Sequence, residues 1–343
     1  MTESADQQPN ALNLNNLNQE MFGALIEPHR RALKAHCYRM MGSIQDAEDM
    51  VQETFLRAWR RRETFEARAS LRAWLYKIAT NICLDALRKR PRRAVPLTHR
   101  AESTLAEPIP ESITEPIWLE PYPDEWLIAE DENPEGHVLA QEHINLAFIA
   151  ALHVLPPRQR AILILREVLD WQSNEVADLL DITVPAVKSA LHRARTTLAN
   201  YDQLSLISQR SESVSSEAIR TQLEDYVRAW ENADIDGLLK LLKEDATFSM
   251  PPIPSWYRGR ATIGALTAKT IFSGQAQGRW RLLPTNANHQ IAFGLYRQGI
   301  NGTYDAYGIQ VLTIDGSLIA DILTFRNPAL LKYFNLPMTL NAY

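Results

Sequence analysis

Apolar residues recur with helical spacing in two stretches of the first third of the chain. In residues 46–61 they fall on one stripe, with acids in the first turn and arginines in the last, a distribution that the helix dipole favours. A second helix is predicted to begin after Ser70, whose hydroxyl suits an N-cap, and to end before Pro91. We therefore expect a helical domain over residues 21–93, preceded by a flexible, polar lead-in over residues 1–20.

A helix-turn-helix is predicted further along the chain. A short helix over residues 174–180 is followed by Asp181 at the turn, and Thr183 is placed to cap the next helix. In that second helix, apolar residues recur from Val187 to Leu198 at the spacing of one buried stripe. We assign this helical domain to residues 137–202.

The last third of the chain begins with helical periodicity and changes to the alternation of strands. Two helices are expected over residues 219–230 and 235–242, and four strand-like runs follow from residue 279. Asp315 and Gly316 form a strong hairpin signal between the last two runs. This order predicts an α+β domain over residues 217–343 with a curved antiparallel sheet.

Charge is segregated along the chain, although the whole molecule carries a formal net charge of only −5. Residues 29–93 contain 16 Lys and Arg against 7 Asp and Glu, whereas residues 101–142 contain 12 acids and no Lys or Arg. The acidic stretch is also rich in proline and does not favour a packed unit, so we interpret residues 94–136 as a linker. A Ser-rich hinge is expected at 203–216.

Composition excludes several classes of protein. Cys37 and Cys83 are the two cysteines, and their spacing favours neither a disulfide framework nor a zinc site. No apolar run is long enough to span a membrane, and the N-terminus lacks the features of a signal peptide. We expect a cytoplasmic protein without a metal or cofactor.

The basic N-terminal helices carry aromatic neighbours, which suits phosphate contact and base stacking. The alternative from charge and periodicity alone is a solvated face with Trp59 and Trp74 in the core. The stretches DAEDMVQETFLRAW and SLRAWLYKIATNICLDALRKR resemble the core-binding and −10-reading region of sigma factors. The resemblance implies that polymerase is contacted by Asp49, Gln52, Glu53 and Phe55, and −10 DNA by Phe65, Arg68, Asn81, Asp85 and Arg88.

The stretch VPAVKSALHRAR resembles the recognition helix of sigma factors, which reads the −35 element. The family often has Gly in place of Asp181 and Arg near Ala190, and the latter difference would weaken a phosphate contact. His192 is either a base contact or a solvated side chain. The residues expected to face the −35 element are Pro185, Ala186, Lys188, Ser189, His192 and Arg193. From residue 143 to 200 the charges nearly balance, with 6 Lys and Arg against 5 acids, so this module should bind DNA poorly without polymerase.

The linker contains an aromatic motif, IWLEPYPDEW, that is too apolar for a simple spacer. Similar motifs occur in sigma factors with a C-terminal extension of this kind. We interpret it as an anchor for the C-terminal domain, and the alternative is local packing against a helical domain. The anchor residues are Trp118, Leu119, Pro121 and Trp126.

The order of helices and strands in the C-terminal domain, together with the stretch WYRGRATI, resembles the SnoaL-like polyketide-cyclase family of cone-shaped folds, in which the cone encloses a pocket. Some relatives are enzymes that use a buried carboxylate or histidine as acid or base. The acid or base candidates here are His289, Asp305 and Asp321, and Trp256, Tyr257 and Tyr307 are possible walls of the pocket. Both aspartates can equally be polar positions on strand faces. We expect a domain without catalytic residues that regulates the chain and is a candidate site for a small-molecule ligand.

Taken together, the sequence predicts two all-α DNA-binding domains, the second with a helix-turn-helix, followed by an α+β SnoaL-like cone. The expected protein is a sigma factor of the extracytoplasmic-function type, with core RNA polymerase and promoter DNA as partners. The alternative is a SnoaL-like enzyme, of cyclase or epoxide hydrolase type, tethered to a DNA-binding module.

Overall fold

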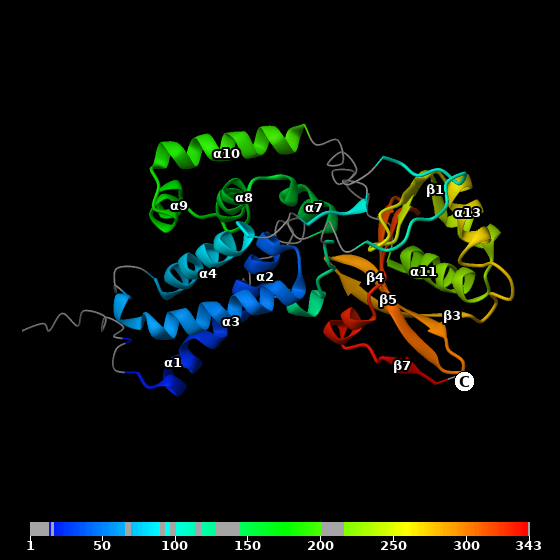
Figure 1. Ribbon diagram of the computed structural model, residues 1–343, viewed down its shortest axis with the longest axis horizontal. Helices are drawn as coiled ribbons and strands as arrows, with labels where there is room; N and C mark the ends of the chain where they lie inside the picture. The colour runs from blue at the N-terminus through cyan, green and yellow to red at the C-terminus, as the bar shows by residue number, and fades with distance from the viewer. Residues whose placement is uncertain are drawn as a thin grey trace, which may run out of the picture. The chain divides into compact units, whose positions relative to one another are not determined.

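The computed structural model describes residues 14, 17–65, 70–89, 93–96, 101–113, 118–127, 145–200 and 216–341. The chain divides into two compact units (Figure 1). The first contains residues 1–41, 45–90 and 156–195, and the second contains residues 42–44, 91–155 and 196–343.

The first unit is built from helices on both sides of the linker. Its N-terminal part contains α1 (Gln19–Ile26), a 3-10 turn η2 (Glu27–His29), α2 (Arg30–Met41), α3 (Ile44–Arg60), η3 (Arg62–Thr64) and α4 (Leu71–Leu87). Ser70 caps α4 as expected, because its Oγ accepts a hydrogen bond from the Ala73 amide at 3.1 Å. The helix α1 was not expected; Asn18 caps it through a 2.8 Å bond from the Met21 amide.

The remaining helices of the first unit are α8 (Pro157–Leu163), a π-helical turn η5 (Ile164–Val168), α9 (Ser173–Leu180) and α10 (Val184–Ala199). They pack on the N-terminal helices, chiefly through α4 with α8 and α9. The Arg160 side chain is buried and donates to the Met40 carbonyl at 2.5 Å. The structure thus packs α8–α10 against residues 17–89 in one compact unit.

The second unit is an α+β fold with linker segments packed on it. Its helices are η4 (Asp124–Trp126), α7 (Leu146–Val154), α11 (Ser216–Glu231), α12 (Ile235–Leu241), α13 (Arg260–Lys269) and η7 (Pro328–Phe334). Its strands are β1 (Leu242–Ser249), β2 (Trp256–Arg258), β3 (Trp280–Ala287), β4 (Gln290–Gln298), β5 (Tyr304–Asp315), β6 (Leu318–Phe325) and β7 (Thr339–Leu340).

The sheet has the strand order β2-β1-β6-β5-β4-β3, with β7 added to β5. The strands β3 to β6 form an antiparallel meander, and Gly316 turns the chain between β5 and β6 at a φ of 61°. The antiparallel sheet expected from residue 279 on is confirmed, whereas β1, which precedes it in the chain, pairs with β6 in parallel. The two strands are separated by α13 and the meander, so their pairing is not a hairpin and need not be antiparallel.

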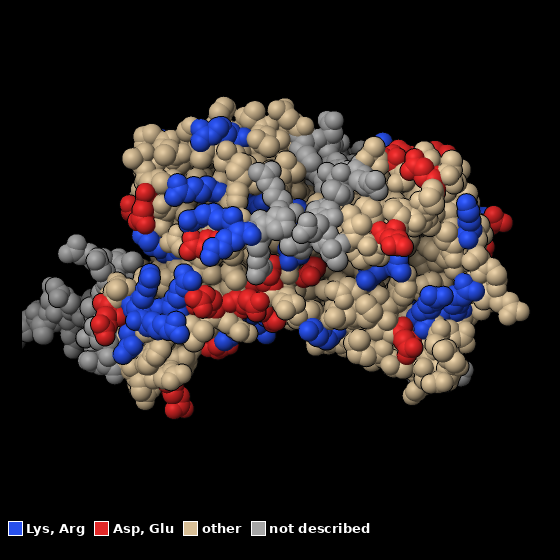
Figure 2. Space-filling model, viewed as in Figure 1, with Lys and Arg blue, Asp and Glu red and all other residues tan. Residues whose placement is uncertain are grey.

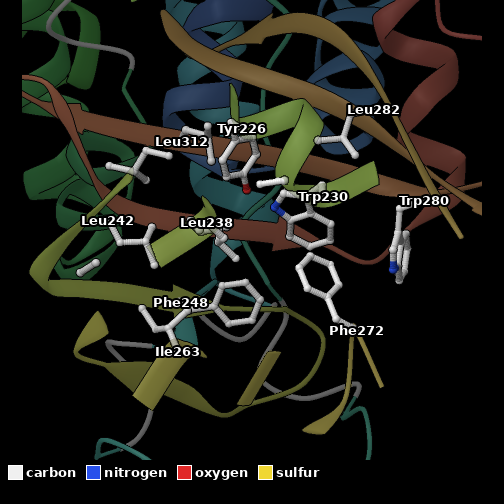
Figure 3. Close-up of a cluster of buried hydrophobic side chains, with 14 of the residues drawn as sticks. Tyr226, Trp230, Leu238, Leu242, Phe248, Ile263, Phe272, Trp280, Leu282 and Leu312 are labelled. Atoms are coloured by element: carbon white, nitrogen blue, oxygen red, sulfur yellow. The ribbon is translucent and has the colours of Figure 1, made fainter. Parts of the chain in front are cut away.

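The core of the second unit lies between α11 and the sheet (Figure 3). Trp230 on α11 meets Phe272 at 5.4 Å and Trp280 at 5.9 Å, both edge to face. Tyr226 stacks on Phe293 of β4 at 5.7 Å. Burial of each such side chain stabilises the fold by about 1.5–3 kcal/mol, which explains why this helix is held on the sheet.

Candidate nucleic-acid interface

The helix-turn-helix has the geometry that the sequence predicted. The helix α9 begins with a capping box in which Gln172 and Glu175 satisfy each other's backbone amides. Asp181 follows it in the left-handed region, at a φ of 52°. Thr183 then caps α10, because its Oγ1 accepts from the Ala186 amide at 3.3 Å.

The helix α10 separates its residues cleanly into a buried and an exposed face. Its buried positions are Val187, Ala190, Leu191 and Ala194. All six residues predicted to face the −35 element are exposed: Pro185, Ala186, Lys188, Ser189, His192 and Arg193. Small residues at the helix start and basic ones beyond it fit entry of this helix into the major groove.

Ala190 is 7% exposed and faces the core. An arginine at this position would point into the unit, so it would not reach a phosphate. The expected weakening of a phosphate contact at Ala190 therefore does not follow from the structure.

The predicted −10 residues of α4 form a second exposed stripe. Asn81, Asp85 and Arg88 lie four and three residues apart and are all exposed, with Arg88 bonded to Asp85 at 2.5 Å. Phe65 is half-buried against Trp74, with the ring centroids 5.4 Å apart. Arg68 lies outside the described residues.

The predicted polymerase-binding residues lie on α3 and differ in exposure. Asp49 and Gln52 are exposed, whereas Glu53 is half-buried and bonds to Arg57 at 2.6 Å. Phe55 lies under the Arg30 guanidinium, which is 4.8 Å from the ring centroid.

A groove of about 530 Å³ lies between α1 and α3. Gln52 and Phe55 line it together with Phe22, Leu56 and Trp59. Leu56 is 51% exposed, an unusual position for a large apolar side chain. Sequence reasoning missed Leu56 as a surface residue, because helical periodicity alone does not show which apolar positions a neighbouring helix leaves uncovered.

The two DNA-reading modules contact each other within the first unit. Lys77 of α4 forms an ion pair with Asp181 at 2.8 Å and donates to the Asp178 carbonyl at 3.0 Å. The Tyr76 and Trp171 rings are 5.5 Å apart. Since Tyr76 is buried and the ion pair is exposed, the aromatic contact contributes more to holding α4 against α9 than the ion pair does.

Basic side chains are numerous on these helices. On the face shown in Figure 2, Lys and Arg side chains gather over the helical first unit, with Asp and Glu among them. A mixed surface of this kind attracts DNA less strongly than a continuous basic patch.

The aromatic motif of the linker packs on the α+β fold. Tyr122 is fully buried; its amide donates to Asn288 Oδ1 at 2.7 Å, and its carbonyl accepts from the Asn288 amide at 2.9 Å. Trp126 meets the ring of Tyr333 edge to face at 5.7 Å. Leu119 and Pro121 are buried, and Trp118 is half-buried with its Nε1 donating to the Ile113 carbonyl at 3.2 Å.

The candidate pocket residues of the C-terminal domain are not brought together. Trp256 and Tyr257 are buried on β2, and Asp305 is exposed on β5. His289 lies in the β3–β4 turn, where its amide donates to Asp124 Oδ1 of the linker at 2.8 Å. A cavity in the described part of this domain is lined by Tyr307, which was also expected as a pocket wall, but by none of the other five candidates.

Asp321 lies on β6, where it accepts a hydrogen bond from Thr247 Oγ1. Burial raises the pKa of this carboxyl to about 6, and the bonds from Thr247 and the Ile322 amide oppose the rise. Asp124 also has a raised pKa because of burial, partly offset by its bond with His289.

Neither a metal cluster nor a membrane span is found in the described part of the chain. No group of three His, Cys, Asp or Glu side chains there is placed to hold a metal ion. None of the described helices combines the length and the apolar character needed to cross a bilayer.

A helical unit with a helix-turn-helix, joined through a linker to an α+β domain, is the organisation of a DNA-binding transcription factor with an accessory domain. Comparison with known families agrees: Sigma-70 region 2 matches residues 25–93, Sigma-70 region 4 matches residues 145–198, and the SnoaL-like domain matches residues 223–322.

The relatives identify the family. The ECF RNA polymerase sigma factor SigG of Mycobacterium tuberculosis is 40% identical over 93% of this chain and 85% of its own. SigJ of the same organism is 28% identical over 65% of this chain and 63% of its own. The crystal structure of SigJ has the same fold, with a TM-score of 0.57 and 22% identity over 92% of this chain and 99% of that chain. The chain therefore belongs to the ECF sigma factors of RNA polymerase.

Proposed function

We propose that this chain binds core RNA polymerase and directs it to promoters by reading the −10 and −35 elements. The observation that carries the proposal is the exposed face of α10, the second helix of the helix-turn-helix. Small and basic side chains lie on this face, and Asp181 makes the left-handed turn before it. By the same reasoning, the exposed stripe of α4 holds the separated −10 strand, and α3 docks on polymerase. The protein acts in the cytoplasm, where polymerase and promoter meet.

The contact between α4 and α9 gives the polymerase a second role. The −10 and −35 elements are centred roughly 25 base pairs apart, which is about 85 Å of B-DNA at 3.4 Å per base pair. Modules joined by a 2.8 Å ion pair between Lys77 and Asp181 cannot read both elements at once. The two modules must separate, and polymerase supplies the scaffold that holds them apart.

The C-terminal domain serves as a built-in regulator and not as an enzyme. The support is the packing of the linker on it, through the paired hydrogen bonds of Tyr122 and Asn288 and the Trp126–Tyr333 contact. The linker connects the two DNA-reading modules, so a domain that holds the linker influences their separation.

Substitution of Lys188 tests the DNA-reading role. Lys188→Ala should weaken open-complex formation with core polymerase about 5- to 100-fold, the range expected for a contact worth roughly 1–3 kcal/mol. Lys240→Ala is the matched control, since Lys240 is also exposed but lies on α12 of the C-terminal domain. Footprinting of a promoter with and without core polymerase provides the readout. Equal footprints for the Lys188 variant and the parent would refute the assignment of α10.

A further inference from the structure

The C-terminal domain contains a cavity of about 210 Å³ whose lining combines apolar side chains with three arginines, Arg279, Arg297 and Arg326. The lining includes no Asp, Glu or His. Arginine guanidinium groups gathered at an apolar cavity without acids create a positive potential that favours an anion.

The guanidinium groups of these arginines differ in how many hydrogen bonds they donate to other residues of the chain. Arg279 donates to the carbonyl of Gln275 at 3.0 Å. Arg326 has a buried Nε without a hydrogen-bond partner in the described part of the chain, and its guanidinium lies 5.3 Å from the centroid of the Tyr307 ring. A buried donor without a partner costs free energy that an acceptor on a ligand would recover.

Arg297 is exposed, and its guanidinium lies 6.0 Å from the centroid of the Trp280 ring. Asp305 is its partner in register on β5, but no ion pair joins these two described residues. Arg297 lines the cavity and therefore remains available to an anion that binds there.

The apolar part of the lining is aromatic and includes the linker. Trp280 and Tyr307 meet edge to face at 5.1 Å. Ile109 of the linker also lines the cavity and is 37% exposed. The segment around it is held on the domain by a 2.9 Å bond from the Ser103 amide to the Trp256 carbonyl and a 3.0 Å bond from the Ile113 amide to the Pro252 carbonyl.

We infer that this cavity is a binding site for a small organic anion, a carboxylate or phosphate head on an apolar body. The head bonds to Arg326 and Arg297, and the body packs on Trp280, Tyr307 and Ile109. The volume is below the range of about 300–1,000 Å³ that is usual for drug-sized ligands, so the ligand is small. This site goes beyond the transcriptional role, and its test measures binding alone.

Isothermal titration calorimetry of the full chain with a panel of small acids tests the inference. The panel contains benzoate, phenylacetate, octanoate and phenyl phosphate, with neutral benzamide as the matched control for benzoate. We expect at least one acid to bind with a submillimolar Kd, and benzamide to bind at least tenfold more weakly than benzoate. Failure of every acid at millimolar concentration, or equal binding of benzamide and benzoate, would overturn the proposal.

Two arginine variants locate the bound anion. Arg326→Gln and Arg297→Gln should each weaken binding of the best acid about 10- to 100-fold, as expected for loss of a charge-assisted hydrogen bond. Arg228→Gln, on α11 and paired with Asp225 at 3.2 Å, should leave the Kd unchanged. Because Arg297 is exposed, its variant should fold even if the Arg326 variant does not. Undiminished binding to folded Arg297→Gln protein would contradict the site.

Discussion

Asp181 shows how a single residue satisfies two requirements. It takes the left-handed conformation that the helix-turn-helix needs, and its carboxylate also bonds to Lys77 of α4. Glycine would meet the first requirement with less strain but could not make the second contact. The sequence showed the turn, because short polar residues tolerate this geometry, but it did not show the partner, which lies 104 residues away.

The raised pKa of Asp321 predicts a dependence of stability on pH. Its pKa rises from an ordinary value of 3.8 to about 6 in the folded chain, so the folded state binds the proton more tightly than the unfolded state. The stabilising contribution is therefore fully present below about pH 4 and is lost as pH rises through 6. Above that pH the ionised carboxylate is a cost of roughly 1–3 kcal/mol.

Replacement of Asp321 tests this contribution. Asp321→Asn should raise the unfolding temperature of the C-terminal domain at pH 7.5, and the gain should shrink at pH 5. Differential scanning calorimetry at the two pH values measures both. Asp305→Asn is the control, because Asp305 is exposed on the neighbouring strand. A loss of stability in the Asp321 variant that is equal at both pH values would contradict the account.

At the scale of elements, periodicity predicted the positions of those helices and strands whose ends depend on nearby residues. The start of α4 after Ser70, the helix α9 and the four strands from residue 280 on lie where the sequence predicted them, because caps, apolar stripes and the Asp315-Gly316 turn depend on neighbouring residues. The pairing of β1 with β6 and the packing of α4 on α9 were not predicted. Both depend on contacts between distant segments, and a pattern within one segment carries no information about its partner.

The contact between the linker and the C-terminal domain, made by Tyr122 and Asn288, can be tested directly. Asn288 is fully buried at a φ of 58° and both accepts from and donates to Tyr122. Asn288→Ala should leave the buried Tyr122 amide without an acceptor, at a cost of about 1–3 kcal/mol. Hydrogen exchange should then speed up over residues 118–127. Asn286→Ala, exposed on β3, is the control, and unchanged exchange in the Asn288 variant would show that the contact does not hold the linker.

At the scale of the whole molecule, the candidate site could be predicted only in part. The exposed faces of α4 and α10 followed from periodicity, since one buried stripe defines the opposite face. The groove between α1 and α3 and the arginine-lined cavity did not, because each is formed by residues from several elements. The candidate pocket residues were chosen by chemical type, and of these only Tyr307 lines the cavity, because type alone does not place a side chain there.

Removal of the C-terminal domain tests its regulatory role. A chain that ends at Ser208 loses the surface on which the linker packs. The separation of its two DNA-reading modules on polymerase should therefore change. Transcription from one promoter, compared between full-length and truncated protein at equal occupancy of core polymerase, should change severalfold. Equal transcript yields would remove the regulatory proposal while leaving the promoter-reading role intact.

The central claim is that two helical modules read one promoter together on the polymerase. Run-off transcription on a pool of genomic promoters, with purified core polymerase and the full-length chain, tests it most directly. The account predicts discrete transcripts that need both the chain and core polymerase and that weaken with Lys188→Ala but not with Lys240→Ala. A chain that neither associates with core polymerase nor yields any promoter-specific transcript would contradict it.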